Sequence, residues 1–144
     1  HFIELAGEIN RNMPEWVVGK VADALNARQK SLNGSRILAL GIAYKRDVDD
    51  MRESPSVFVM EHLRDRGVIV EYSDPNVPKF PRMREHRFDL SSVELTPEAL
   101  SSYDAVILLT DHSAFDYSQI LEHANLIIDT RGKYRIVDEK IVKA

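Results

Sequence analysis

The sequence contains no cysteine among its 144 residues. A chain without cysteine has no disulfide framework, no thiolate metal ligand and no thiol nucleophile. It also lacks an apolar run of the length that a membrane-spanning helix needs. Its N-terminus lacks the basic region, apolar core and small-residue cleavage site of a secretory signal. Together these absences predict a cytoplasmic protein that has no thiol chemistry and no membrane contact.

An excess of positive charge is missing as well. The formal net charge is -4 and the isoelectric point is about 5.7, which argues against nucleic acid or an anionic membrane as the main partner. Local cations could still hold a small anionic ligand. The length suits about one domain, which could bury roughly 68 to 70% of its unfolded surface in a real core.

Signatures of several catalytic sites are absent. No Gly-x-Ser-x-Gly motif occurs, and the neighbours Asp111, His112 and Ser113 do not make a catalytic triad, because a triad is assembled in space. The five histidines are scattered and do not stand at metal-ligand spacing with other strong donors. We therefore predict no catalytic residue and no metal site in this chain.

One stretch, residues 36–56, organises the rest. The apolar run from Ile37 to Ile42 predicts a buried strand of a parallel sheet that is covered on both faces. Gly41 lets the chain turn. Ser54 followed by Pro55 predicts a helix start, in which the Ser54 hydroxyl accepts a hydrogen bond from a free backbone N–H and proline occupies the first helical position.

The remaining elements alternate between strand and helix. A strand at residues 36–40, a helix at 55–66 and a strand at 68–72 form a βαβ unit with a right-handed crossover. The helix at 55–66 is expected to carry Val57, Phe58, Met60, His62 and Leu63 on or near its buried side, with Gly67 as its C-cap. Further helices are predicted at 97–102 and 117–124 and further strands at 105–109 and 126–128, and residues 136–142 predict either a small hairpin or a last strand. The pattern indicates an α/β fold with a Rossmann-like open parallel sheet flanked by helices.

The loop at residues 75–95 shows no sustained period and is long enough to be functional or mobile. It contains several prolines and basic residues. Arg84 and His86 could touch a ligand there.

A long helix is predicted before the sheet. From Phe2 to Leu25 apolar residues recur at three- and four-residue steps, with Trp16 or Val17 at one of them. The pattern continues across Pro14, so either one kinked helix or a second helix beginning at Asn12 is possible. A helix this long and apolar needs a partner surface. We expect a helical segment at 1–32, which packs either on a partner surface or only on its own domain, before a domain at 33–144. We also expect the chain to be a piece of a longer protein.

Polar groups follow the predicted strands at their carboxyl ends, where ligands bind in open α/β sheets. They are Tyr44 and Lys45, Asp74, residues 110–112, and Arg131. Lysine and arginine suit a diphosphate or a carboxylate, and tyrosine offers a ring face and a hydroxyl. The other charged residues after the first strand are predicted to pair with one another and hold the shape of the loop: Asp47, Asp49, Asp50, Arg52 and Glu53.

A dinucleotide site is not predicted after the first strand. The fingerprint requires further glycines where the backbone approaches the pyrophosphate. Gly41 is instead followed by Ile42, Ala43 and Tyr44. We therefore expect no cofactor to bind this chain.

Six segments resemble the carboxy-terminal, UDP-binding domain of the UDP-glucose/GDP-mannose dehydrogenase family and occur in the same order as in that domain. Their sequences are most similar to the UDP-N-acetylglucosamine 6-dehydrogenase branch. They are residues 4–10, 12–14, 41–45, 49–55, 72–75 and 129–131. Any one motif alone is weak, but together they cover nearly the whole chain and are specific.

The resemblance implies a function. Members of the family oxidise the C6 alcohol of a nucleotide sugar twice to a carboxylate, with two NAD and a catalytic cysteine, and NAD sits on a separate amino-terminal domain. In the family this domain binds the UDP part of the sugar nucleotide, which implies that Tyr44, Lys45 and Arg131 bind substrate. The family's long helix links the middle domain to this one and forms much of the homodimer core, which implies an interdomain and dimerisation helix at 1–32 before the UDP-binding domain at 33–144. Some members carry a basic residue near the position of Pro14 that acts across the dimer, and Arg11 could match it.

Two consequences follow from the resemblance. Because the chain has neither the NAD domain nor a cysteine, we expect it to be inactive alone, with UDP-N-acetylglucosamine or UDP-N-acetylmannosamine as the substrate of the whole enzyme. The alternative is a non-catalytic α/β module for dimerisation or for nucleotide-binding regulation. A receiver-like domain is disfavoured, because the first strand ends in glycine and lysine rather than in an acidic cluster.

Overall fold

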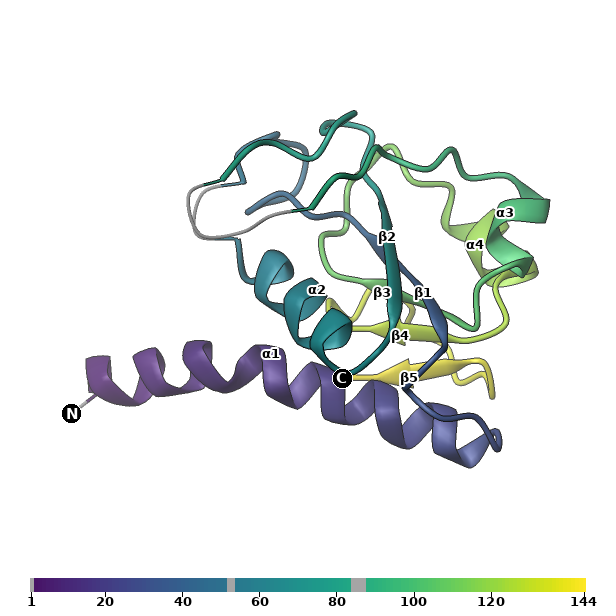
Figure 1. The fold of residues 1–144 in the computed structure, drawn as a ribbon, viewed down its shortest axis with the longest axis horizontal. Coiled ribbons are helices and arrows are strands. Elements are labelled where there is room, and N and C mark those ends of the chain that lie inside the picture. The colour runs from purple at the N-terminus through teal and green to yellow at the C-terminus, as the bar shows by residue number, and fades with distance from the viewer. Residues whose placement is uncertain (1, 52–53, 84–87) are drawn as a thin grey trace.

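The computed structural model describes residues 2–51, 54–83 and 88–144 (Figure 1). Its helices and strands alternate along the chain. In order they are α1 (Phe2–Ala27), β1 (Arg36–Leu40), α2 (Pro55–Asp65), β2 (Ile69–Ser73), α3 (Pro97–Ser101), β3 (Ala105–Leu108), α4 (Tyr117–His123), β4 (Ile127–Asp129) and β5 (Ile141–Lys143).

All five strands belong to one parallel sheet in the order β2-β1-β3-β4-β5. The predicted open parallel sheet with flanking helices is therefore confirmed. Because β1 lies between β2 and β3, the chain winds to one side of β1 and then to the other. The topological switch point thus falls between the carboxyl ends of β1 and β3, where open α/β sheets bind ligands.

The two faces of the sheet are covered by different helices. Ile37 and Ala39 of β1 lie in one hydrophobic core together with residues of α1 and α2, whereas Leu38 and Leu40 lie in a second core with residues of α3 and α4. All four side chains are fully buried. This double coverage explains why β1 is a continuous apolar run, as predicted.

Helix α1 runs unbroken through Pro14, which decides between the two possibilities that the sequence left open. Val17, Val21 and Leu25 are buried in the core that α1 shares with α2 and β1. Trp16 is 60% exposed. The N-terminal half of α1 projects past the rest of the molecule (Figure 1). The C-terminal half of α1 packs in the core of the sheet domain. The division of the chain at residue 32 stays a prediction.

The start of α2 differs from the prediction. The Ser54 side chain caps no helical N–H. Its hydroxyl instead donates to the carbonyl of Ile42 at 2.7 Å and ties the start of α2 to the segment after β1. In contrast, Thr96 Oγ1 accepts from the Ala99 N–H at 3.0 Å and caps α3.

The buried face of α2 was predicted correctly in part. Val57, Met60 and Leu63 are buried, but Phe58 is 42% exposed, so that expectation was wrong. The buried residues Ser56, Val59, Met60 and Leu63 follow the i, i+3, i+4, i+7 pattern of one helix face, and position 58 falls off it. Gly67, with φ of +85°, follows the C-cap residue Arg66.

Element bounds otherwise shift by about one residue from those predicted. The tail forms the last strand, β5, parallel to β4, and not a hairpin. Between residues 75 and 95 the described part of the loop contains an isolated antiparallel bridge, Lys79 with Ser91. Arg52, Glu53, Arg84 and His86 lie outside the described residues.

Candidate functional site

The chain after β1 turns sharply at Gly41, which has φ of +78°. A Cβ on Gly41 would lie 2.2 Å from the carbonyl oxygen of Thr110, so only glycine fits against the segment after β3. The Gly41 N–H donates to the carbonyl of Ser73 at 2.9 Å. Backbone from three strand ends therefore meets here.

Asp74, at the end of β2, holds the first residues of the loop after β1. Its Oδ2 accepts from the N–H of Ile42 at 2.8 Å and from that of Ala43 at 3.2 Å, and its Oδ1 accepts from the Asn76 N–H at 2.8 Å. Burial opposes ionisation of Asp74, but hydrogen bonds from His112 and from the Ile42 and Asn76 amides outweigh it and lower the pKa of the carboxyl below its ordinary value.

His112 links Asp74 to the far side of the same loop. Its Nδ1 lies 2.8 Å from the backbone nitrogen of Asp47, and its Nε2 lies 2.8 Å from Asp74 Oδ2. A backbone N–H can only donate, so Nδ1 must be the acceptor. The proton then sits on Nε2 and is donated to Asp74, which makes His112 a neutral imidazole of one fixed tautomer. The His112 side chain is fully buried.

Asp47 closes the far side of the loop on the segment after β3. Its carboxylate accepts from the Ser113 N–H at 2.7 Å and from the Ser113 hydroxyl at 2.6 Å, and these two hydrogen bonds lower the pKa of Asp47. Arg46 pairs with Asp111. Asp47 was predicted to pair with other charged residues of its own loop, but its hydrogen-bond partner is Ser113, after β3.

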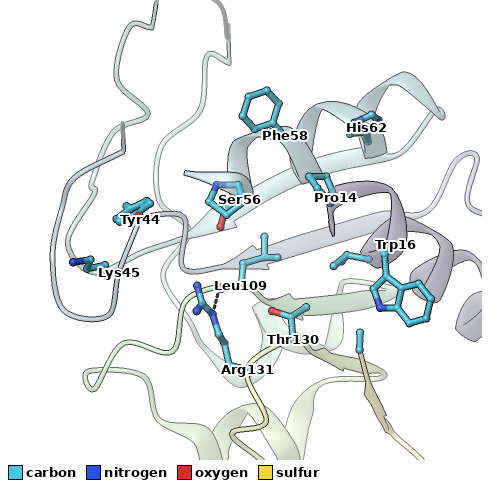
Figure 2. Close-up of a pocket in the computed structure, with 13 residues that line it drawn as sticks. Pro14, Trp16, Tyr44, Lys45, Ser56, Phe58, His62, Leu109, Thr130 and Arg131 are labelled. Carbon is cyan, nitrogen blue, oxygen red and sulfur yellow. Dashed lines mark hydrogen bonds between the residues drawn. The ribbon is translucent and has the colours of Figure 1, made fainter. Parts of the chain in front are cut away.

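Tyr44, Lys45 and Arg131 line one pocket of about 830 Å³ (Figure 2). It is bounded by α1, the first turns of α2, the loop after β1 and the ends of β3 and β4. Further lining side chains are Pro14, Trp16, Val17, Phe58, His62 and Thr130. The pocket thus combines two cations with several aromatic rings.

The two cations reach the pocket from different strand ends. The Lys45 ammonium lies 5.7 Å from the centre of the Tyr44 ring and makes no ion pair with any residue in the described ranges. Arg131 donates from Nε to the Leu109 carbonyl at 2.6 Å, and its backbone N–H donates to Asp129 Oδ1 at 2.9 Å. These contacts orient the guanidinium and leave its outer N–H groups toward the pocket (Figure 2).

The sequence placed more residues at this site than the structure brings together. Tyr44, Lys45 and Arg131 share the pocket, but Asp74, Thr110 and His112 are buried behind the loop and support it. Thr110 Oγ1, for example, donates to the Ala43 carbonyl at 2.7 Å. These three groups shape the loop and do not face a ligand.

Trp16 and Phe58 are two exposed lining residues that sequence reasoning missed. Both were assigned to buried helix faces, Trp16 as an alternative to Val17, yet both are exposed at the pocket. The available signal was the helical period, because at 100° per residue Trp16 cannot share the buried face with Val17 and Val21 equally.

The turn after β1 does not fit NAD. The N–H groups that would cradle a pyrophosphate belong to Ile42 and Ala43, and both already donate to Asp74. The missing glycines and these occupied donors both argue against a dinucleotide at this turn.

Within the described ranges, no group of three or more His, Cys, Asp or Glu side chains could hold a metal ion. Among the described residues, no helix is both long enough and apolar enough to cross a membrane.

Comparison with protein families identifies residues 38–136 as a UDP binding domain of the UDP-glucose/GDP-mannose dehydrogenase family. The chain belongs to this family. The matched segment includes the loop after β1, the buried Asp74 and His112, and Arg131. The predicted family is confirmed, and with it membership of a family of oxidoreductases.

Relatives of known name are similar to the chain over most of its length. The chain is similar to the UDP-N-acetyl-D-mannosamine dehydrogenase of Escherichia coli, with 30% identity over 145 aligned positions that cover 92% of this chain and 32% of the relative. It is also 36% identical over 114 positions to the enzyme of that name from Methanococcus maripaludis, covering 79% of this chain and 24% of the relative. The chain therefore spans about a third or less of these relatives.

Solved structures agree on the fold. An NDP-N-acetyl-D-galactosaminuronic acid dehydrogenase from Methanosarcina mazei matches with a TM-score of 0.76 and 25% identity, covering all of this chain (100%) and 31% of that one. A UDP-N-acetyl-mannosamine dehydrogenase from Staphylococcus aureus matches with a TM-score of 0.68 and 27% identity, covering 94% and 32%. The chain thus has the fold of the corresponding part of these structures.

Proposed function

We propose that the pocket lined by Tyr44, Lys45 and Arg131 binds the UDP part of a nucleotide sugar. The observation that carries the proposal is the convergence of Lys45 and Arg131 on one pocket beside the switch point of the sheet. Each cation projects from the loop after a different strand, so together they can reach two phosphates of one ligand. Arginine offers paired N–H donors, and lysine offers a mobile point charge.

The aromatic side chains supply the complementary surface. Tyr44 is 43% exposed beside Lys45, and Trp16 and Phe58 stand on the two helices at the opposite wall. Exposed rings at a pocket can stack on a base or a sugar. The pocket therefore suits a ligand with a charged middle and flat or apolar ends, as a nucleoside diphosphate sugar has.

The whole protein is proposed to be an NAD-dependent dehydrogenase that oxidises C6 of a UDP-N-acetylhexosamine. The names of the relatives favour N-acetylmannosamine as the sugar of the substrate, whereas the sequences of the motifs favoured N-acetylglucosamine. NAD and the catalytic cysteine would come from parts outside these 144 residues, which contain no cysteine. We therefore propose that this chain binds substrate and is inactive alone. A cytoplasmic location and a role in polysaccharide biosynthesis belong to the same proposal.

Homodimerisation through α1 is part of the proposal too. The N-terminal half of the helix projects past the domain (Figure 1), and an isolated helical segment needs a packing partner to be stable in water. Analytical ultracentrifugation of residues 1–144 beside residues 14–144 tests it. We expect the longer chain to be a dimer and the shorter one a monomer, and equal masses per particle would contradict the role of α1.

Calorimetric titration of the chain with UDP tests the binding site. We expect Lys45→Ala and Arg131→Ala each to weaken UDP binding about tenfold, which corresponds to about 1.4 kcal/mol. Lys133→Ala is the matched control: it removes an equal charge two residues from Arg131, but Lys133 lies over the Tyr117 ring and does not line the pocket. Equal losses in all three variants would indicate general electrostatics. Dimerisation without any affinity for UDP would favour the alternative, a non-catalytic α/β module for dimerisation.

Titrations with UDP-N-acetylmannosamine and with UDP-N-acetylglucosamine, each compared with UDP alone, test whether this chain contacts the sugar and which sugar it prefers. Affinities equal to that of UDP would mean that sugar contacts come from other parts of the protein.

A further inference from the structure

Lys45 owes its place at the pocket to its backbone. Its ammonium lies near the Tyr44 ring and makes no hydrogen bond or ion pair with another described residue, and both side chains are exposed. Nothing in the side chain itself fixes where the charge stands. The position of the charge is therefore set by how the loop of residues 41–50 is held.

The loop is held on both sides of Tyr44 and Lys45. Before them, Asp74 and Thr110 take up the N–H groups of Ile42 and Ala43 and the carbonyl of Ala43. After them, His112 accepts from the Asp47 N–H. The Tyr44 N–H donates to the Asp50 carbonyl at 2.7 Å and closes the loop on itself.

The clamp after Lys45 depends on an unusual backbone conformation. Asp47 has φ of +62°, in the left-handed region that aspartate, asparagine and glycine tolerate best. In this conformation its N–H points at His112 Nδ1 while its carboxylate receives both donors of Ser113. His112 can accept there only because its proton is donated from Nε2 to Asp74. One imidazole thus joins the two sides of the loop.

From this arrangement we infer that Asp47 and His112 are positioning residues for the ligand, which set UDP affinity by fixing the Lys45 loop without touching UDP. The inference rests on the proposed function. Neither residue lines the pocket. An unclamped loop would hold Lys45 in place for only a fraction of the time, and the apparent Kd would rise in inverse proportion to that fraction.

The sign of the effect separates positioning from electrostatics. Asp47 carries a negative charge two residues from Lys45, so by charge alone its removal should strengthen the binding of an anion. Positioning predicts the opposite. Asp49 is the matched control, because it is an exposed carboxylate in the same loop and makes no hydrogen bond or ion pair with any other residue that the structure describes.

The experiment is titration of the 144-residue chain with UDP in four variants. Asp47→Gly keeps the left-handed backbone accessible but removes the carboxylate, and we expect the Kd to rise about fivefold or more. Asp47→Asn keeps the conformation and one acceptor for the Ser113 N–H, and should restore most of the affinity. Asp49→Gly and Asp49→Asn should bind UDP as well as the unmodified chain or better. Unfolding midpoints, recorded in parallel, should stay well above the titration temperature.

The role of His112 is tested by spectroscopy rather than by mutation, because its replacement would leave the buried Asp74 carboxylate without one of its hydrogen bonds. Nitrogen NMR of the imidazole should show a proton on Nε2 and none on Nδ1 in the unmodified chain. A proton on Nδ1 would overturn the inference.

The outcomes separate this inference from the proposed function. If Lys45→Ala weakens UDP binding and Asp47→Gly does not, or if Asp49→Gly weakens it equally, the positioning role is wrong and the UDP site stands. If the unmodified chain does not bind UDP, both are overturned.

Discussion

Replacing Gly41 by alanine should be far more damaging than an ordinary glycine substitution. Two costs add at this position. The backbone has φ of +78°, where an L side chain costs about 1 to 2 kcal/mol. The new methyl group would also stand 2.2 Å from the Thr110 carbonyl oxygen and 2.7 Å from Thr110 Cβ. Thr110 is fully buried and hydrogen-bonded to Ala43, so it cannot move aside cheaply. Forced contacts in a packed interior cost about 1 to 3 kcal/mol more.

Gly34 provides the matched control for this prediction. Its φ is +86°, but nothing lies within 4 Å of a Cβ built there. Gly34→Ala therefore measures the conformational cost alone, about 1 to 2 kcal/mol. Urea unfolding followed by circular dichroism gives both free energies of unfolding. At about 3 °C per kcal/mol for a chain of this size, thermal melts should separate the variants as well. Equal destabilisation by the two substitutions would refute the argument that close approach of β1 and β3 requires glycine.

Three further predictions concern the described residues around the site. Asp74→Asn should lower the free energy of unfolding near neutral pH. Because the folded pKa of Asp74 is lowered, the stabilisation by its carboxylate is full above the unfolded pKa of about 3.9 and is lost as pH falls through the folded pKa. A destabilisation by Asp74→Asn that does not shrink in acid would contradict this. Trp16 is the single tryptophan of the sequence and lines the pocket, so UDP should change the intrinsic fluorescence, with a midpoint shifted to higher UDP in Lys45→Ala. Leu25→Ala should cost about 2 to 5 kcal/mol, because Leu25 is fully buried; a cost near zero in urea unfolding would mean that α1 is a detachable linker.

The elements of this fold could be predicted from local patterns. The run from Ile37 to Leu40 has no polar residue because both of its faces are covered, and the pair Thr96 and Pro97 starts a helix as local capping chemistry requires. Ser54 has the same sequence signature, but its hydroxyl goes to Ile42 instead. Whether a hydroxyl caps its own helix or bonds a neighbouring segment is decided by tertiary contacts, which no local pattern contains.

The site could be predicted only as a set of strand ends. Parallel strands bring Lys45 and Arg131 to one edge, and that inference needs no side-chain detail. The division between ligand-facing and supporting groups could not be read in the same way. Asp74 and His112 are 38 residues apart and meet side chain to side chain at 2.8 Å, so their roles depend on a contact made only in the folded state.

The supporting hydrogen bonds also explain how an acidic chain can present a cationic pocket. The net charge is -4, and the same edge of the sheet carries the carboxylates of Asp47, Asp74, Asp111 and Asp129. Each of them receives hydrogen bonds from within the protein. Asp47 accepts from Ser113, and Asp74 accepts from His112 and backbone amides. Asp111 pairs with Arg46, and Asp129 accepts from the backbone amides of Arg131 and Tyr134. Lys45 and the outer N–H groups of Arg131 are left to set the local field. Because these cations are exposed, their attraction for a diphosphate is screened over about 8 Å at physiological salt. UDP affinity should therefore fall as salt rises, and it should fall less steeply in Lys45→Ala, which has one fewer charge to screen.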